Sequence, residues 1–194
     1  MNFIKDYLKE TKVIIDQLNL QDISKIVECI FAVRKKKGRI FFIGVGGSAA
    51  NASHAVNDFR KLAGIECYAP TDNVSELSAR TNDEGWPTVF ESWLKISKLS
   101  KKDLLFIFSV GGGNLKKNIS PNIVKAIQYA KLKKTTVCGI VGKHGGYTKK
   151  FANACLCIPA KNPLHLTPHS ESFQAIIWHL LVSHPKIKKF KTKW

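Results

Sequence analysis

The hydrophobic and polar positions of the chain change their period repeatedly along its length. Near the start, apolar residues recur at helical spacing and predict amphipathic helices over residues 3–18 and 22–36. Short apolar runs rich in β-branched and aromatic residues predict five strands, at residues 39–44, 65–69, 104–109, 135–141 and 154–159. Helical periodicity returns between and after these runs, at residues 47–63, 74–80, 121–132, 145–151 and 167–185 and in a segment from residue 87.

Several helix ends are predicted from single residues. Asp22 is expected to cap the second helix, and Gly38 to end it. Thr167 is the expected N-cap of the last helix, because Pro168 then takes the first helical position. Residues 82–85 have the composition of a turn.

Strands that alternate with helices predict an α/β three-layer sandwich around a parallel sheet with right-handed crossovers. We expect a flavodoxin-like strand order 2-1-3-4-5, which makes strands one and three neighbours at the switch point. The 194 residues suit one domain. It is predicted to span residues 1–185, with a helical pair at 1–37, followed by a mobile basic tail at 186–194.

Composition limits the classes of partner. The net charge of +17 suits phosphate esters, polyanions or an acidic membrane. The lysines, however, lie in scattered clusters rather than in the pattern of interleaved exposed aromatic residues that a nucleic-acid groove favours, so such a groove is not expected. No apolar run approaches the ~18 residues of a membrane span, and no signal-peptide pattern opens the chain, which predicts a cytoplasmic protein. The five cysteines lack C-x-x-C spacing and are expected to be reduced and structural.

Two glycine loops follow predicted strands. Gly46 and Gly47 come after the first strand and open a helix, where exposed N–H groups bind anions. A second loop, residues 110–114, follows the third strand. In the expected strand order both loops flank one crevice, which predicts a single phosphate-containing ligand.

A dinucleotide site is the competing interpretation of the first loop. Gly44, Gly46 and Ala49 satisfy the dinucleotide fingerprint, and Glu66 lies about where a ribose-binding acid belongs. A dinucleotide fold, however, does not require the second glycine loop.

Candidate catalytic and metal-binding residues lie on two predicted helices. His54 and Asp58 are four residues apart and share one helix face, although a core histidine with a surface acid would give the same pattern. The last helix carries Glu171, Gln174 and His179. Histidine, aspartate and glutamate together form a plausible Zn²⁺ set. Glu171 and His179 are about 12 Å apart along a regular helix, so they can share one metal only by reaching inward from opposite sides.

The other histidines are expected at the surface or in loops. His169 is the exception, because it opens the last helix beside Glu171. The remaining three are His144, His165 and His184.

The chain resembles the sugar isomerase (SIS) domain proteins, and more closely the phosphoheptose isomerases. The resemblance covers nearly the whole chain, including the two leading helices and the closing helix with His179. It rests on residues 44–54, Thr71-Asp72, residues 82–85, Ser109 with its loop, and residues 142–146.

The resemblance implies a set of site residues and partners. The substrate would be held by Val45, Gly46, Gly47 and Ser48. Its hydroxyls would be contacted by Asn82 and Asp83. Its phosphate would bind to Ser109 with Val110, Gly111 and Asn114. The zinc and acid/base positions of the family fall on His54, Asp58, Glu171 and His179, and Asp58 and Glu171 would also face the substrate. The family further implies a homotetramer.

The sequence departs from the family pattern at the site itself. Val45 replaces an asparagine, Asp58 a glutamate and Glu171 a glutamine. Three hydroxyl residues of the second loop become Val110, Gly111 and Asn114, although residues 111–113 can still offer backbone N–H groups as an anion-binding nest. The substrate contacts are therefore expected to differ from those of typical members.

The resemblance implies an aldose–ketose isomerase that interconverts sedoheptulose 7-phosphate and D-glycero-D-manno-heptose 7-phosphate through an enediol. Asp58 is the expected base and His179 its acid/base partner. Asp58 is also a candidate zinc ligand, and the sequence leaves both roles open. The alternative is a non-catalytic SIS module that binds a sugar phosphate or a protein.

Overall fold

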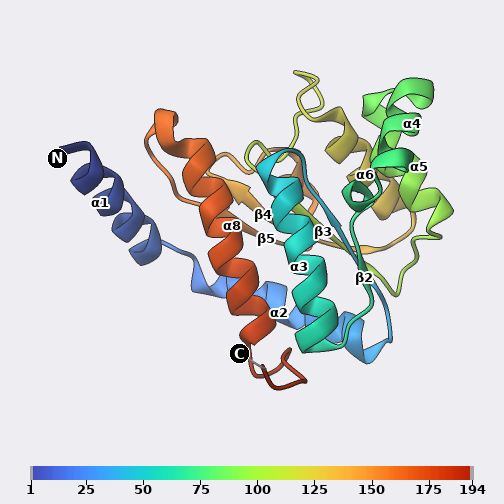
Figure 1. The fold of residues 1–194 in the computed structure, drawn as a ribbon, viewed down its shortest axis with the longest axis horizontal. Helices are drawn as coiled ribbons and strands as arrows, with labels where there is room; N and C mark the ends of the chain where they lie inside the picture. The colour runs from blue at the N-terminus through green and yellow to red at the C-terminus, as the bar shows by residue number, and fades with distance from the viewer. Residues whose placement is uncertain (1, 193–194) are drawn as a thin grey trace.

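The computed structural model describes residues 2–192. It has a five-stranded parallel sheet between two layers of helices (Figure 1). The sheet order β2-β1-β3-β4-β5 confirms the expected topology. The strands are β1 (Ile40–Ile43), β2 (Cys67–Tyr68), β3 (Leu104–Ser109), β4 (Thr136–Gly142) and β5 (Ala154–Ile158).

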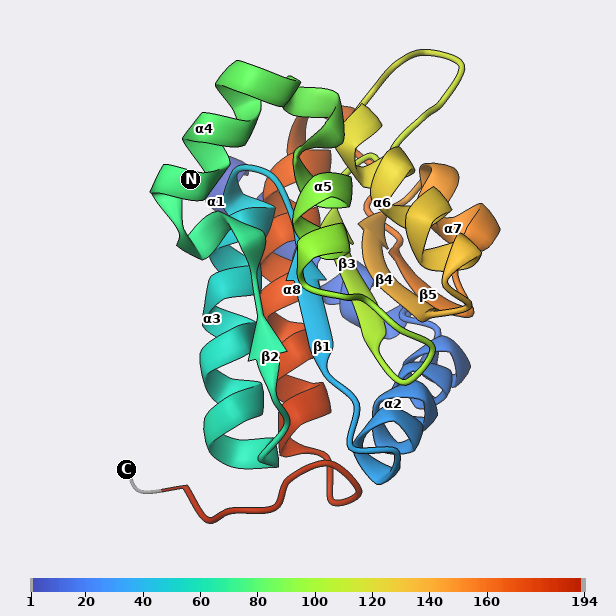
Figure 2. The same ribbon diagram turned by 90° about the vertical axis from the view of Figure 1, so that its right-hand side faces the viewer.

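Helices cover both faces of the sheet. Helices α2, α3 and α8 pack on one face, and α5, α6 and α7 on the other (Figure 2). The helices are α1 (Asn2–Asp16), α2 (Leu20–Lys35), α3 (Gly47–Ala63), α4 (Val74–Glu84), α5 (Val89–Ile96), α6 (Pro121–Leu132), α7 (Gly146–Phe151) and α8 (Leu166–Ser183). Three 3₁₀ turns join them, η1 (Pro70–Asp72), η2 (Trp86–Thr88) and η3 (Pro163–His165).

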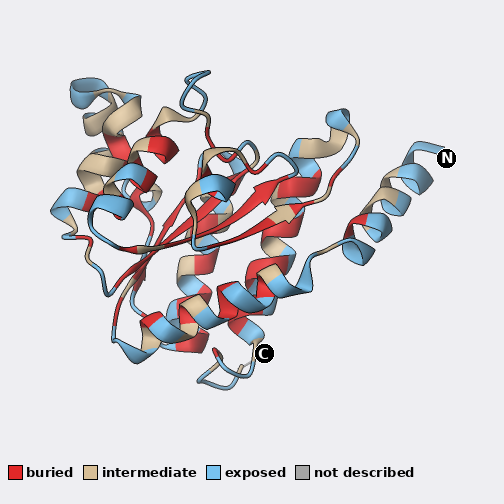
Figure 3. Cartoon of the chain, turned by 180° about the vertical axis from the view of Figure 1, so that it is seen from behind, coloured by how far each residue is buried: buried red, intermediate tan, exposed pale blue. Residues whose placement is uncertain are grey.

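The strands are apolar because a parallel sheet is covered on both faces. All six residues of β3 are buried, and the sheet is the most continuously buried part of the chain in Figure 3. On one face Phe42 stacks on Phe106, with ring centroids 5.2 Å apart, and contacts Phe59 of α3. On the other face Phe41 meets Trp93 of α5 edge to face. The central strands are thereby fixed between α3 and α5.

Some predicted boundaries are wrong. Asn19, rather than Asp22, caps α2, because its side chain accepts a hydrogen bond from the Asp22 N–H at 3.0 Å. Helix α8 begins one residue before Thr167, directly after η3, so His165 is its N-cap residue. The predicted turn at residues 82–85 is helical up to Glu84, and the chain turns only at Gly85, where φ is +82°.

Residues 186–192, the described part of the segment predicted to be a mobile tail, pack on the rest of the domain. Ile187 is fully buried, and the N–H groups of Lys189 and Phe190 donate to the Leu62 carbonyl at 2.8 and 3.0 Å. The Arg34 guanidinium also donates to the Ile187 carbonyl. An apolar residue within a basic run therefore anchors the segment, and residues 193–194 lie outside the described part.

Helix α1 projects beyond the sheet, and its axis leans away from the other helices (Figure 1). Ile14 is its one buried residue among those described. No helix within residues 2–192 has the length and apolar character needed to cross a membrane. All five cysteines are free thiols, and burial raises the pKa of Cys67 well above its usual range.

Candidate active site

The first glycine loop connects β1 to α3 at the carboxyl edge of the sheet. Gly46 has φ +62° and is the N-cap residue of α3, a conformation that favours glycine. A Cβ at Gly44 would overlap the Ser48 backbone, so the loop closes tightly on the start of the helix. Ser48 is buried in the first turn, whereas Val45 is 39% exposed beside it. The loop thus presents the N-terminus of α3 and one apolar side chain to solvent.

The second glycine loop follows β3 and is fixed by the first turn of α7. The Gly112 carbonyl accepts hydrogen bonds from the Thr148 N–H and hydroxyl, both at 2.8 Å. The Gly113 carbonyl accepts from the Tyr147 N–H at 2.7 Å. Strands β1 and β3 are adjacent and parallel, so both glycine loops leave the same edge of the sheet, as predicted.

The carbonyl directions of this loop also set its N–H directions. In a trans peptide the N–H points opposite to the carbonyl of the same unit. The Val110 carbonyl accepts from the Gly142 N–H at 3.0 Å, so the Gly111 N–H points away from β4. By the same rule the Gly113 N–H points away from α7. The Gly112 N–H donates to the Ser109 hydroxyl at 3.0 Å.

Substitution at neighbouring glycines of this loop should have very different effects. A Cβ at Gly112, where φ is +68°, would overlap the Gly145 backbone carbonyl. We expect Gly112→Ala to lower the free energy of unfolding by about 1–3 kcal/mol, since the backbone must leave its present conformation. Gly111 has open space around its Cβ position, so Gly111→Ala should change stability by less than about 0.5 kcal/mol. Urea denaturation measures both, and equal effects would contradict this geometry.

Three predicted site residues meet between α3 and α8. His54, Asp58 and His179 each offer a ligand atom within 4.8 Å of those of the other two. His54 and Asp58 lie on one face of α3, as their spacing predicts, and His179 reaches them from α8. Asp58 is buried, while both histidines are exposed. The cluster is therefore open to a ligand from one side.

Hydrogen bonds orient the groups of this cluster. The Nδ1 atom of His179 lies 2.8 Å from the Ala175 carbonyl, which can only accept, so Nδ1 carries a proton. In the neutral ring Nε2 then has a lone pair, and it faces Asp58 Oδ2 at 3.9 Å. Asp58 Oδ1 accepts from the Asn57 amide at 2.8 Å, which leaves Oδ2 for this approach. Two acceptors facing each other favour a proton or a metal ion between them.

Trp178 forms the back of the cluster, a role that was not predicted from the sequence. Its ring stacks on His179 with centroids 3.5 Å apart and lies 4.6 Å from the His54 ring. Trp178 is fully buried, so it limits the rotation of both imidazoles. The apolar pattern of α8 predicts a buried residue at this position but does not indicate that it contacts the two histidines.

Glu171 lies outside the cluster of His54, Asp58 and His179. Its carboxylate lies against Gly47, where a Cβ would overlap it. The Asn51 amide holds this part of α8, because it donates to the Glu171 carbonyl at 2.9 Å and to Gln174 Oε1 at 3.1 Å. Glu171 is therefore directed to the first glycine loop, and its role as a metal ligand stays a prediction.

Asn82 and Asp83 occupy the exposed C-terminal turn of α4. The Asn82 amide donates to the Asp83 carboxylate at 2.8 Å. Helix α4 packs on α5 and the neighbouring 3₁₀ turns. Asn114 closes the second glycine loop through paired backbone hydrogen bonds with Ile119. Contacts of Asn82, Asp83 and Asn114 with a substrate stay predictions.

The sheet order and the two glycine loops define a flavodoxin-like α/β fold. Comparison with known proteins identifies its family. Residues 5–142 match the SIS domain model. The chain belongs to the SIS domain family. Phosphoheptose isomerase 1 from Campylobacter jejuni is 32% identical over 167 residues, covering 82% of each protein.

Two further comparisons show the breadth of the family. The lincomycin biosynthesis protein LmbN from Streptomyces lincolnensis is 33% identical over 158 residues, which cover 76% of this chain and 56% of that protein. The structure of phosphoheptose isomerase GmhA from Neisseria gonorrhoeae superimposes with a TM-score of 0.81 at 20% identity, covering 93% of this chain and 96% of that one. The structural likeness confirms the fold.

Proposed function

We propose that the protein is an aldose–ketose isomerase that interconverts sedoheptulose 7-phosphate and D-glycero-D-manno-heptose 7-phosphate. The observation that carries the proposal is the cluster of His54, Asp58 and His179 between α3 and α8, in a fold whose two glycine loops leave one edge of the sheet. Isomerisation needs one base and one acid near adjacent carbons, and a seat for the phosphate at the other end of the sugar. Phosphoheptose isomerases among the relatives support the choice of a seven-carbon substrate.

Asp58 and His179 are the proposed acid/base pair. Asp58 Oδ2 takes the proton from C1 of the ketose, which gives an enediol, and the proton is returned to C2 to form the aldose. His179 assists from Nε2, which exchanges a proton with the sugar oxygens, because its Nδ1 is held by the Ala175 carbonyl. The burial of Asp58 keeps water from competing for the proton.

Zinc fits the same three side chains. Two imidazoles and a carboxylate are an established Zn²⁺ donor set, and their ligand atoms already lie within 4.8 Å of one another. The lone pair of His179 Nε2 facing Asp58 Oδ2 is satisfied by a cation. A bound zinc ion would supply Lewis-acid polarisation of the sugar oxygens. His54, Asp58 and His179 are the proposed ligands, with Glu171 as a further one. Because a zinc ion would use the lone pairs of His179 Nε2 and Asp58 Oδ2, metal binding and proton transfer are alternative roles for these two residues.

The phosphate seat is proposed to be the second glycine loop with the Ser109 hydroxyl. The N–H groups of Gly111 and Gly113 point away from β4 and α7 and are the proposed donors to the phosphate, while the Gly112 N–H is bonded to the Ser109 hydroxyl. Asn114 and Val110 flank this seat. Gly46, Gly47 and Ser48 would hold the sugar at the N-terminus of α3. The apolar Val45 and the acidic Glu171 would line the site beside them.

Turnover of the named substrate tests the proposal. Purified protein is incubated with sedoheptulose 7-phosphate, and the aldose product is followed by NMR, with fructose 6-phosphate as the comparison sugar. We expect conversion of the heptulose with kcat/KM at least about tenfold above that for the hexose, because one missing carbon group costs roughly 1–3 kcal/mol in a fitted site. Failure to convert either sugar, with or without added Zn²⁺, would reject the isomerase.

A non-catalytic sugar-phosphate binding module is the second candidate. It is favoured by the second loop, where hydroxyl side chains are absent at Val110, Gly111 and Asn114. The first loop likewise presents the exposed apolar Val45 rather than an amide. Binding of sedoheptulose 7-phosphate without any conversion would favour this module.

A homotetramer is proposed as the assembly. Helix α1 carries four large apolar side chains that are more than half exposed, Phe3, Ile4, Leu8 and Ile15, at 66%, 64%, 56% and 52%. Burial of such side chains against another copy is favourable by roughly 25 cal/mol per Å² of apolar surface. Light scattering on the purified protein gives the mass, and a monomeric mass would refute the assembly.

A further inference from the structure

A second group of imidazole and carboxylate side chains lies outside the proposed active site. Glu10 of α1, His165 of η3 and His169 of α8 bring one ligand atom each within 4.8 Å of the others. Glu10 Oε2 lies 2.8 Å from His165 Nδ1 and 3.0 Å from His169 Nε2. We call these three residues the α1–α8 cluster. It joins the first helix to the last across more than 150 residues of sequence.

The hydrogen bonds of the α1–α8 cluster conflict at His165. An ionised carboxylate only accepts, so His165 Nδ1 needs a proton to bind Glu10. The same nitrogen lies 3.0 Å from the Asn162 amide nitrogen, which is itself a donor. The Asn162 amide cannot be turned round, because its oxygen accepts from the Leu164 N–H at 3.1 Å. Without a metal ion, the Asn162 amide and the protonated His165 Nδ1 are therefore two donors that face each other.

A metal ion removes this conflict. It takes the place of the two ring protons and accepts the lone pairs of His165 Nδ1 and His169 Nε2, while the Asn162 amide continues to donate to Glu10 Oε1 at 2.9 Å. Zinc–ligand bonds of about 2.0–2.1 Å in a tetrahedral site separate ligand atoms by about 3.3 Å. The two observed separations of 2.8 and 3.0 Å need to open by only a few tenths of an ångström.

The surroundings of the α1–α8 cluster hold its ligands in place. Tyr7 stacks on the His169 ring with centroids 4.4 Å apart, and it meets His165 edge to face at 5.1 Å. His169 is 2% exposed, so its ring has little freedom to rotate. The ligand atoms are thus preorganised by the packing around them.

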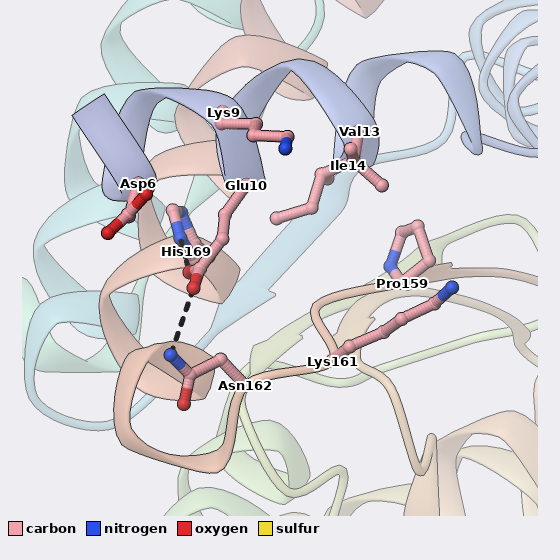
Figure 4. A pocket seen from close by; sticks show the side chains of 9 residues that line it. All are labelled: Asp6, Lys9, Glu10, Val13, Ile14, Pro159, Lys161, Asn162 and His169. Atoms are coloured by element: carbon pink, nitrogen blue, oxygen red, sulfur yellow. Dashed lines mark hydrogen bonds and ion pairs between the residues drawn. The ribbon is translucent and has the colours of Figure 1, made fainter. Parts of the chain in front are cut away.

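A cavity gives an entry route to the α1–α8 cluster. It has a volume of about 500 Å³ and lies between α1 and the segment that follows β5. Figure 4 shows Glu10, Asn162 and His169 converging on one side of this cavity, with Lys9 and Lys161 at other points of its wall. A fourth coordination position would open toward the cavity and be filled by water.

We propose that Glu10, His165 and His169 form a second site for a divalent transition metal of the zinc type, which clamps α1 onto the start of α8. It has two nitrogen donors and one oxygen donor, the set that zinc accepts in proteins. Because α1 has one buried apolar residue among those described, the metal would supply much of its attachment. Bound metal stabilises the folded chain by mass action.

Metal titration in a background without the first cluster tests this site. The background is untagged, EDTA-treated protein that carries His54→Gln and His179→Gln. These changes remove two ligands of the cluster of His54, Asp58 and His179, and folding should be retained because both histidines are exposed. This background should bind one equivalent of Co²⁺, with the visible absorption of a site of low coordination number, and one of Zn²⁺ in competition. Zn²⁺ should also raise its melting temperature.

Variants of the α1–α8 cluster complete the test. Glu10→Gln or His165→Gln in the same background should weaken Zn²⁺ binding at least about tenfold and remove the rise in melting temperature. His144→Gln, at an exposed loop histidine, is the matched control and should bind as the background does. A background that binds no metal, or a Glu10→Gln variant that binds as tightly as the control, would overturn the proposal. Circular dichroism confirms that each variant is folded.

Discussion

Asp58→Asn is expected to lower kcat for isomerisation of sedoheptulose 7-phosphate by about 10²–10⁴-fold, the contribution of a general acid or base. The amide has nearly the shape of the carboxylate, and its oxygen can still accept the hydrogen bond from Asn57. It cannot take a proton from carbon. The fold should therefore survive while the chemistry fails, and steady-state kinetics with circular dichroism measure both.

A matched substitution separates the chemistry from a general loss of charge. Asp16 lies exposed at the end of α1, so Asp16→Asn makes the same chemical change away from the site. It should leave kcat within about twofold. Sugar-phosphate binding by Asp58→Asn, measured by calorimetry, should also persist. If Asp58→Asn turned over substrate as fast as Asp16→Asn, Asp58 would not be the base.

Asp103→Ala should lower the free energy of unfolding by about 3–5 kcal/mol, as expected when one partner of a buried ion pair is removed. Asp103 is 2% exposed and joins the beginnings of β1 and β3. Its carboxylate accepts from the Arg39 N–H, Nε and Nη2 at 2.9, 3.2 and 2.9 Å, and from the Ser100 N–H and hydroxyl at 2.9 Å each. Urea denaturation at neutral pH measures the loss.

The same carboxylate gives a pH dependence with a definite sign. Burial raises the pKa of Asp103, but the hydrogen bonds from Arg39 and Ser100 together lower it below the usual value. A depressed folded pKa contributes stability above the unfolded pKa of about 3.9 and loses it as the pH falls. The difference between wild type and Asp103→Asn should therefore shrink below about pH 4. A difference that stayed constant or grew would contradict the assignment.

The sequence predicted the sheet because its signals are local and strong. Residues 104–108 form an uninterrupted apolar run, and with Ser109 they make a fully buried strand with the predicted bounds. Strand β2 is shorter than expected: five residues were predicted, and only Cys67–Tyr68 pair with β1. The cap of α2 was misplaced because Asn19 and Asp22 are both good N-cap residues at adjacent turns.

Site residues could be grouped from the sequence where they lie on the same helix. His54 and Asp58 follow from the i, i+4 rule, and His179 from the resemblance to the family. Glu171 was grouped with them by residue type and by the resemblance; its carboxylate lies against Gly47, and its role as a metal ligand stays a prediction. The partnership of Glu10 with His165 and His169 had no sequence signal, because 155 residues separate Glu10 from the nearer histidine. Only tertiary packing of α1 brings them together.

Solvent exchange during isomerisation tests the central claim most directly. The protein is incubated with sedoheptulose 7-phosphate in D₂O, and the aldose is examined by NMR. An enediol formed by proton abstraction exchanges with solvent, so we expect deuterium at C2 of the aldose with wild type and none with Asp58→Asn. Conversion without any deuterium at C2, or deuterium incorporation by Asp58→Asn at the wild-type rate, would contradict the account.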